Sequence, residues 1–206
     1  MSPLDKLTAY FERFPGVGAR QARRYAFHIL TLSEHETTEL ATAIQNLRSS
    51  VQRCRSCQRF FTQASASHDH CSICTDPNRD RQTLLIVSHD NDITAIERSG
   101  TYTGLYFVLG GTVPLLHEPN ATQLRSGALK QSVQQRITDD ELQEIILGFP
   151  INPDGENTGR FVTHILDPII TDTTIRIAEL GRGLSTGSEL EYADSETIKN
   201  ALRNRH

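Results

Sequence analysis

The sequence predicts a multi-module α/β protein with a helical N-terminal module, a four-cysteine zinc module, a parallel α/β domain and a C-terminal helix. Apolar residues recur at helical spacing as far as residue 52, and two Cys-x2-Cys pairs follow at 54–57 and 71–74. Short apolar runs then alternate with helical patterns. The predicted module boundaries are 1–53, 54–78, 79–180 and 181–206.

Length and composition fit a globular protein with a core of its own. The chain has 206 residues, of which 37% are hydrophobic and 22% charged. It begins without the pattern of a secretory signal, and no apolar run approaches the roughly 18–20 residues of a membrane span. We therefore expect a cytoplasmic protein without membrane contact. In that reducing compartment cysteines persist as thiols, so their role is sought in metal binding or chemistry.

The N-terminal module is predicted to contain three helices. Leu7 and Phe11 belong to the first apolar pattern, and a second pattern starts at Ala19. Ser33 followed by Glu36 is the capping box of a third helix. Between the first two helices stands "FPGVG", residues 14–18, which predicts a helical hairpin whose second helix begins at glycine.

The start of that second helix is a candidate phosphate site. Its first N–H groups lack intrahelical partners and carry the positive end of the helix dipole, and glycines let a phosphate approach closely. A helix connection with merely solubilising arginines is the alternative. Pro-Gly-Val-Gly followed by an Ala-x3-Tyr-Ala helix resembles a helix-hairpin-helix DNA-binding motif. The predicted DNA-binding residues, which contact phosphates without regard to sequence, are Gly16, Val17, Gly18, Arg20, Arg23 and Arg24.

The charge distribution agrees with an anionic partner at the N-terminal end. Residues 1–60 carry nine basic and five acidic side chains, and the remainder carries 12 basic and 20 acidic ones. An acidic chain with a basic N-terminal part is not expected to coat DNA along its whole surface.

The four cysteines predict a structural metal centre. Cys54-x2-Cys57 and Cys71-x2-Cys74 are separated by thirteen residues, and two such pairs supply the four thiolates of a closed tetrahedral Zn²⁺ site. We expect one zinc ion per chain, bound as this short stretch folds. Disulfides, a redox thiol pair, or ligation by a neighbouring histidine (His68 or His70) fit two matched pairs less well.

Four short apolar runs predict the strands of the α/β domain: "TLLIVS" (83–88), "GLYFVLGG" (104–111), "EIILGF" (144–149) and "TIRIAEL" (174–180). Because helical patterns separate them, we expect a parallel sheet covered on both faces. The last segment, "SETIKNALRNRH", places Ile198 and Leu202 on one stripe of a helix suited to subunit contact.

This domain resembles the Toprim domain of topoisomerases and primases, which holds Mg²⁺ with a Glu after the first strand and an Asp-x-Asp after the third. Here Ser88 stands at the first position and "GFPINPDGENTG" follows the third strand. A serine cannot replace a carboxylate as a ligand of a hard divalent ion. We therefore expect no catalytic residue and no enzyme, and regard a Mg²⁺-dependent nuclease or primase-like enzyme as the alternative. The acidic residues nearby are expected to cap helices, with a weak Mg²⁺ site as the alternative: Asp90, Asp92, Asp154 and Glu156.

Taken in order, the modules resemble the RecR family of bacterial recombination mediators over nearly the whole chain. "FPGVGARQARRYAFHIL", "AIERSGTYTGLYFVLGG" and "LEYAD" carry the resemblance. It implies a non-enzymatic DNA-binding protein, associated with the nucleoid, that acts with RecO, and in many bacteria with RecF, to load RecA on single-stranded DNA in recombinational repair. It also implies a homo-oligomeric ring, either tetramer or dimer. Ser88 departs from the family pattern, in which a Glu is usual.

Overall fold

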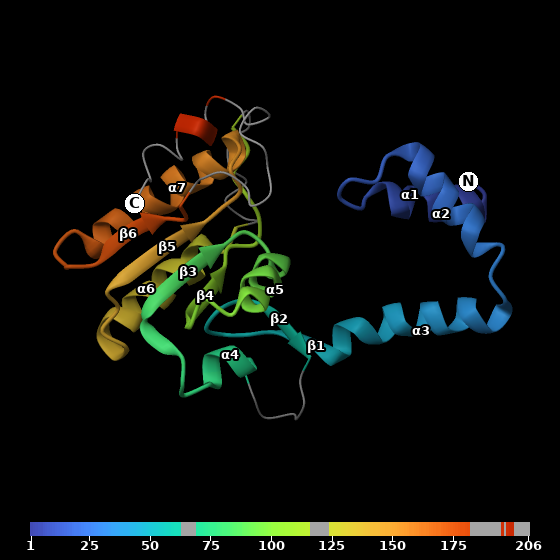
Figure 1. The fold of residues 1–206 in the computed structure, drawn as a ribbon. Coiled ribbons are helices and arrows are strands. Elements are labelled where there is room, and N and C mark those ends of the chain that lie inside the picture. The colour runs from blue at the N-terminus through green and yellow to red at the C-terminus, as the bar shows by residue number, and fades with distance from the viewer. Residues whose placement is uncertain (63–68, 116–123, 182–194, 196, 200–206) are drawn as a thin grey trace. The chain divides into compact units, whose positions relative to one another are not determined.

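The computed structural model describes residues 1–62, 69–115, 124–181, 195 and 197–199 of the chain (Figure 1). Two compact units are present, Met1–Gln52 and Arg53–His206. No helix within the described ranges is long and apolar enough to cross a membrane.

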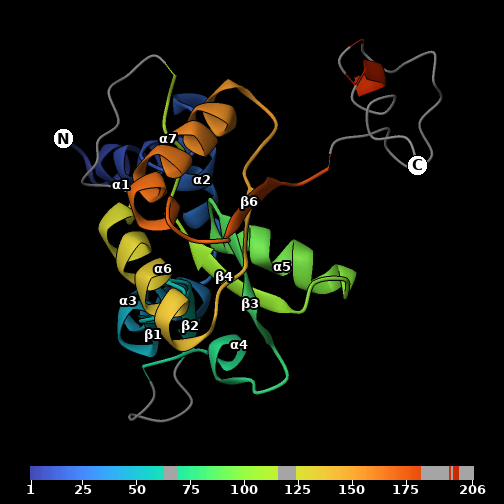
Figure 2. The ribbon, with the colours of Figure 1, turned by 90° about the vertical axis from the view of Figure 1, so that its left-hand side faces the viewer.

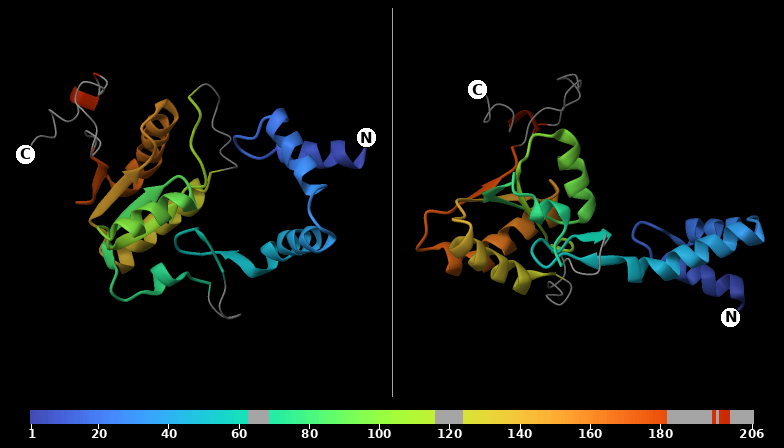
Figure 3. Two further views of the ribbon diagram at one scale, coloured as in Figure 1. Left: turned by 45° about the vertical axis from the view of Figure 1, so that its right-hand side comes forward. Right: turned by 90° about the horizontal axis from the view of Figure 1, so that it is seen from below.

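The first unit consists of helices α1 (Pro3–Glu12), α2 (Ala19–Ile29) and α3 (Glu34–Ser50), as predicted (Figure 3). The Ser33 hydroxyl accepts a hydrogen bond from the Glu36 N–H at 3.2 Å, and the Glu36 carboxylate accepts one from the Ser33 N–H at 2.8 Å. This reciprocal pair is the expected capping box. A second such box, between Ser2 and Asp5, starts α1.

Helices α1 and α2 pack through small and aromatic side chains. Ala22 and Ala26 of α2 are fully buried, and because alanine is small the two helices can approach closely. The Phe11 ring meets the Tyr25 ring edge-on, with 5.8 Å between centroids. No residue of α1 or α3 is fully buried. The helix caps and the small apolar contact between α1 and α2 therefore stabilise this unit.

The second unit begins with a small module around the cysteines. Strands β1 (Val51–Arg53) and β2 (Phe60–Thr62) pair in a two-stranded sheet, and the short helix α4 (Ser72–Thr75) follows. We call residues 53–62 and 69–76 the cysteine module.

The rest of the second unit alternates strands with helices, as predicted. Its strands are β3 (Asp80–Val87), β4 (Gly104–Val108), β5 (Glu144–Gly148) and β6 (Arg176–Glu179), and its helices are α5 (Asp90–Ser99), α6 (Ser126–Asp139) and α7 (Pro153–Ile170). All strands pair in parallel in the order β4-β3-β5-β6. Figure 2 shows α5 on one face of this sheet and α6 and α7 on the other.

Two neighbouring strands, the central strand β3 and the edge strand β4, show why this sheet forms. Residues 84–87 of β3 and 105–108 of β4 are all buried, without alternation, because helices cover both faces. β3 and β5 are neighbours, yet their following helices lie on opposite faces. Ligands of such sheets bind where neighbouring connections diverge in this way, so the loops after β3 and β5 mark the position where a ligand of this domain is expected.

The predicted C-terminal helix lies mostly outside the described residues, as do Leu202 and the "LEYAD" segment. Ser195 and residues 197–199 are helical, and the Ile198 side chain is partly buried.

Candidate metal centre and nucleic-acid interface

The four predicted cysteines come together. Their Sγ atoms all lie within 4.8 Å of one another, and the Sγ atoms of Cys57 and Cys71 are 3.6 Å apart. Cys54 and Cys57 lie between β1 and β2. Cys71 is the N-cap of α4, and Cys74 lies within that helix. The cluster therefore joins two short segments that have little apolar surface of their own.

Tight backbone turns hold each cysteine pair in place. The Gln58 N–H donates to the Cys54 carbonyl at 3.0 Å, and the Thr75 N–H donates to the Cys71 carbonyl at 3.1 Å. Gln58 adopts φ +63°, the left-handed conformation that such a sharp turn requires. The Cys71 N–H also points at the Cys54 Sγ, 3.4 Å away. An amide aimed at sulfur favours the thiolate form that binds metals.

The sulfurs are free thiols rather than disulfides. A hydrogen bond from the Cys57 thiol lowers the pKa of Cys54. The same hydrogen bond to Cys54 raises the pKa of Cys57 far above its usual range. One thiol thus ionises at the expense of another, because four neighbouring thiolates repel one another unless a cation compensates them. The donor set fits a single metal ion, and within the described ranges it is the only group of such ligands.

The cysteine module is anchored to the end of β4. The Val108 N–H donates to the Cys57 carbonyl at 2.8 Å. Arg125, which precedes α6, donates through Nη1 to the Gln58 carbonyl at 2.6 Å and to the Val108 carbonyl at 3.1 Å. Its guanidinium also lies over the Phe60 ring, 5.5 Å from the centroid. Sequence reasoning did not identify Arg125, since no spacing motif links it to residues more than sixty positions earlier.

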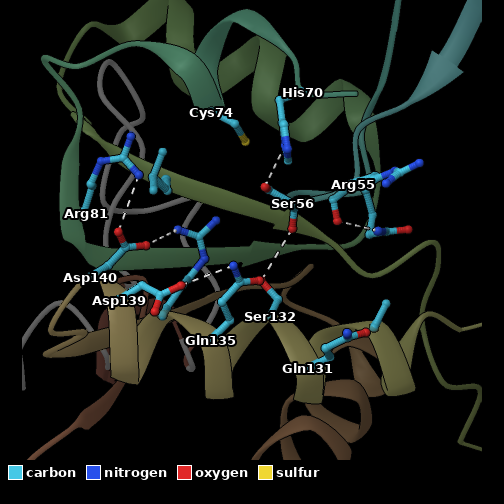
Figure 4. Close-up of a pocket in the computed structure, with 14 residues that line it drawn as sticks. Arg55, Ser56, His70, Cys74, Arg81, Gln131, Ser132, Gln135, Asp139 and Asp140 are labelled. Atoms are coloured by element: carbon cyan, nitrogen blue, oxygen red, sulfur yellow. Dashed lines mark hydrogen bonds and ion pairs between the residues drawn. The ribbon is translucent and has the colours of Figure 1, made fainter. Parts of the chain in front are cut away.

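A cavity of about 560 Å³, which we call the seam, separates the cysteine module from α6 (Figure 4). Its charged side chains mostly pair with one another. The Asp140 carboxylate lies 3.4 Å from Nη1 of Arg81 and 3.3 Å from Nη1 of Arg136. On the opposite side, the Ser56 Oγ lies 2.9 Å from Nδ1 of His70. His70 therefore contacts Ser56 instead of joining the cysteine ligands, and His68 lies outside the described residues.

The predicted phosphate site forms an open helix start. Gly16 has φ +75°, which favours glycine, and an added Cβ at Gly18 would meet nothing within 4 Å. Gly18 is the N-cap of α2 and offers no side chain to it, and the first helical bond runs from the Ala22 N–H to the Gly18 carbonyl at 3.0 Å. The N–H groups before Ala22 thus remain available to an external acceptor. Val17 is half-buried and holds the turn through its N–H, which donates to the Phe14 carbonyl at 3.1 Å.

The three predicted arginines are all exposed on α2. Arg23 lies over the Phe27 ring at 5.8 Å, and Arg24 donates to the Gln21 side chain at 3.4 Å. Within the described residues, neither they nor Arg20 form an ion pair with a carboxylate. Their charge is therefore offered to solvent or to an anion.

The loops after β3 and β5 hold no metal-binding cluster in the described part of the chain. Ser88 is fully buried and its Oγ has no hydrogen-bond partner there. Capping is correct for Asp92, whose carboxylate accepts from the His89 N–H at 2.7 Å. It is wrong for Asp90 and Asp154.

These two carboxylates anchor neighbouring segments. Asp90 accepts from the Phe60 N–H at 2.6 Å, and Asp154 accepts from the Leu115 N–H at 2.9 Å. The sequence could not show this, because their partners are remote in the chain. Gly155 allows the first turn of α7, which contains Asp154, to lie against the Pro150 carbonyl. A Cβ at Gly155 would lie 1.8 Å from that carbonyl oxygen.

Comparisons with known proteins agree with these modules. A family model described as "RecR, helix-hairpin-helix" matches residues 4–48, and one described as "RecR, C-terminal" matches residues 183–206. The recombination protein RecR of Bifidobacterium longum subsp. infantis is 34% identical over 98% of this chain and 94% of its own length. Those of Lactococcus lactis subsp. cremoris and Staphylococcus aureus are each 32% identical over 98% of this chain and 96% of their own lengths.

Proposed function

The chain belongs to the RecR family of recombination proteins, and from that premise we propose that it is a non-enzymatic mediator that binds DNA without sequence preference. Together with RecO, and in many bacteria RecF, it would load RecA on single-stranded DNA during recombinational repair. The observation that carries the proposal is the uncapped start of α2 at Gly18, followed by three exposed arginines.

The proposed DNA contact has two parts. The first N–H groups of α2 bind one phosphate oxygen, with Gly16 and Gly18 leaving room and Val17 fixing the turn. Arg20, Arg23 and Arg24 reach the flanking phosphates of the same backbone. Because phosphates carry no base identity, affinity depends on salt and little on sequence.

We propose that the cysteine cluster holds one structural Zn²⁺. Four thiols with tight turns on both sides fit its tetrahedral preference and leave no open position for a substrate. The cysteines would hold the metal, which would stabilise the module without taking part in a reaction. We also propose that the chain is organised in four modules, residues 1–53, 54–78, 79–180 and 181–206.

We further propose a closed homo-oligomer, a ring of two or four chains. The α3 side chains Leu40, Ile44 and Leu47 are exposed along one stripe. An apolar stripe on a helix is covered when a second copy packs against it. Light scattering at tens of micromolar would give a mass above that of one 23.1 kDa chain, and a monomer under those conditions would contradict the ring.

An enzymatic role is disfavoured by Ser88. A buried hydroxyl stands where a metal-binding carboxylate would be needed, and Asp90 and Asp154 are occupied by backbone N–H groups. A Mg²⁺-dependent cleavage assay on single-stranded and duplex DNA separates the two readings. Cleavage that is lost in Asp154→Ala would favour the nuclease.

The direct test of DNA binding is Gly18→Asp. Aspartate is a good N-cap, so the helix should fold at least as well, but its side chain occupies the phosphate position and repels the phosphate. We expect at least a tenfold loss of DNA affinity in fluorescence anisotropy, which is about 1.4 kcal/mol.

Gly127→Asp is the matched control for this test. It adds the same charge at an equally open glycine of α6, which belongs to the second unit. Equal affinities of the Gly18 and Gly127 variants would show that the hairpin is only a helix connection.

A further inference from the structure

A second cavity of about 520 Å³ lies on the other side of the cysteine module, against α5. We call it the groove. Arg59 and Phe60 line it from the cysteine module, while Asn91, Thr94 and Arg98 line it from α5. It is distinct from the seam, which faces α6, and from the hairpin, which belongs to the first unit.

The Phe60 ring is exposed and firmly placed. Its side chain is 52% accessible, while its N–H is tied to Asp90 at 2.6 Å and Arg125 lies over the ring. The guanidinium lies over one face of the ring, and about half of the residue remains accessible to a partner. A fixed aromatic face beside water favours stacking by a flat partner, and every unpaired nucleobase offers one.

The groove also carries two guanidiniums, those of Arg59 and Arg98, beside two carboxylates whose hydrogen bonds go to other partners. Of its two carboxylates, Asp90 is bound to the Phe60 N–H. Glu97 accepts from Arg79 at 2.9 Å and from the Tyr106 hydroxyl at 2.6 Å. Within the described ranges no ion pair involves Arg59 or Arg98. The Arg59 and Arg98 side chains therefore line the same groove as the Phe60 ring without being in an ion pair among the described residues.

The seam does not offer the same chemistry. There Asp140 lies between two arginines, and Cys74, one of the metal ligands, forms part of the wall. The described residues that line the seam include no Phe, Tyr or Trp side chain. Of the two cavities, the groove is thus the one that offers both a ring for stacking and arginines outside the ion pairs of the described part of the chain.

We propose that the groove binds single-stranded nucleic acid, with one unpaired base stacked on Phe60 and the flanking phosphates on Arg59 and Arg98. A duplex cannot supply that base, because its bases are already stacked on each other. This proposal rests on the proposed DNA binding and adds to it a preference for single strands, which the phosphate contacts of the hairpin do not provide.

The test uses an intrinsic reporter. The chain has no tryptophan, so Phe60→Trp introduces the one indole in the protein, at the proposed stacking position. An oligo(dT) strand of about 20 nucleotides should quench its fluorescence by stacking. A duplex of the same length should leave the fluorescence unchanged. Absence of quenching at low salt up to about 100 µM strand, the weak end of non-specific binding, would overturn the proposal.

Affinity measurements provide the second arm. Phe60→Leu keeps an apolar side chain but removes the flat face, and we expect it to weaken oligo(dT) binding about 5- to 20-fold, within the range for loss of one stacked base. Duplex affinity should stay the same and metal content should be unchanged. Arg59→Ala with Arg98→Ala should lower the salt dependence for single strands by up to about two units of slope.

The outcomes separate this proposal from the hairpin proposal. Gly18→Asp should weaken binding to single strands and duplex alike while leaving residual quenching in the Phe60→Trp background. If Gly18→Asp weakens binding but Phe60→Leu has no effect, the hairpin binds DNA and the groove does not. In that case the present proposal would be wrong.

Discussion

The arginines of α2 and three enclosed arginines of the second unit have opposite surroundings. On α2 of the first unit, Arg23 and Arg24 contact only a neutral ring and a neutral amide. In the second unit, Arg79 is held by Glu97, Arg125 by two backbone carbonyls, and Arg136 by Asp140. An arginine thus stabilises the fold where acceptors of the protein surround it. It is available for binding another molecule where the protein supplies no charged acceptor.

The units also differ in what stabilises them. The first unit depends on local helix caps and two buried alanines. The second depends on contacts between distant segments, among them the cysteine cluster and the Arg125 hydrogen bonds. Substitutions at the hairpin should therefore change binding and spare stability, and substitutions of the cysteine ligands and of Arg125 should lower stability.

The largest effect is expected from Cys57→Ser. We predict loss of the bound metal and a fall of at least about 3 kcal/mol in the free energy of unfolding, because structural zinc contributes about 10–16 kcal/mol in zinc-finger peptides. Elemental analysis and denaturant titration measure the two quantities.

Ser72→Ala, beside Cys71, is the control. In Cys57→Ser, hydrogen exchange should show that the cysteine module loses protection while α1 and α2 keep theirs. An equal loss of protection in both units would contradict the inference that the two units are stabilised separately.

Arg125→Ala should have the next largest effect. It removes two charge-assisted hydrogen bonds from a half-buried site and leaves two carbonyls without this donor, so we expect about 2–4 kcal/mol of destabilisation. Burial lowers the pKa of this guanidinium, yet arginine keeps its charge at neutral pH.

Arg81→Ala, in a partly exposed ion pair, should cost less than about 1 kcal/mol. Equal costs for the two arginines, read from urea unfolding curves, would contradict the anchoring role of Arg125.

Glu97→Gln should give a smaller, pH-dependent effect. A hydrogen bond from Arg79 lowers the pKa of Glu97. The unfolded chain therefore binds a proton here more readily than the folded one, and the contribution of Glu97 is complete above the unfolded value of about 4.3 and is lost as pH falls through the depressed folded value. We expect about 1–2 kcal/mol of destabilisation at pH 7.

Urea unfolding of Glu97→Gln and the parent at matched pH values measures this difference, which should shrink toward acid. A difference that grows as pH falls would contradict the sign of the pKa shift. Glu144→Gln, whose pair with Arg176 is more exposed, is the control.

The smallest effect on folding is expected from Arg20→Ala. Its side chain is exposed and lacks an ion pair in the described region, so stability should change by less than about 0.5 kcal/mol. The slope of log affinity against log salt for DNA should fall by about one unit or less. Arg160→Ala, at an exposed position of α7, should leave that slope unchanged, and similar slopes for both variants would remove Arg20 from the DNA contact.

Local patterns predicted the elements well. The Ser33 and Glu36 box, the glycine before Ala19, and the four apolar runs each reflect interactions within a few residues or a uniform burial of strands. The approach of the four cysteines was also predictable, because the chemistry of two Cys-x2-Cys pairs has few other uses.

Contacts between remote residues were not predictable. Asp90 and Asp154 read as helix caps because each lies in the first turn of a helix, whereas their partners Phe60 and Leu115 lie 30 and 39 residues away. The placement of the Phe60 ring likewise depends on where Arg125 lies. Such assignments need the fold, since a single sequence carries no register between segments.

One hydrogen bond has a consequence for solubility. β4 is an edge strand, and its Val108 N–H, which points away from β3, is occupied by the Cys57 carbonyl. An unpaired, fully apolar strand edge is a template on which another chain can add a strand. The cysteine module therefore shields the end of the most hydrophobic strand. Stripping the metal should favour aggregation through this edge at concentrations where the metal-bound protein stays dispersed.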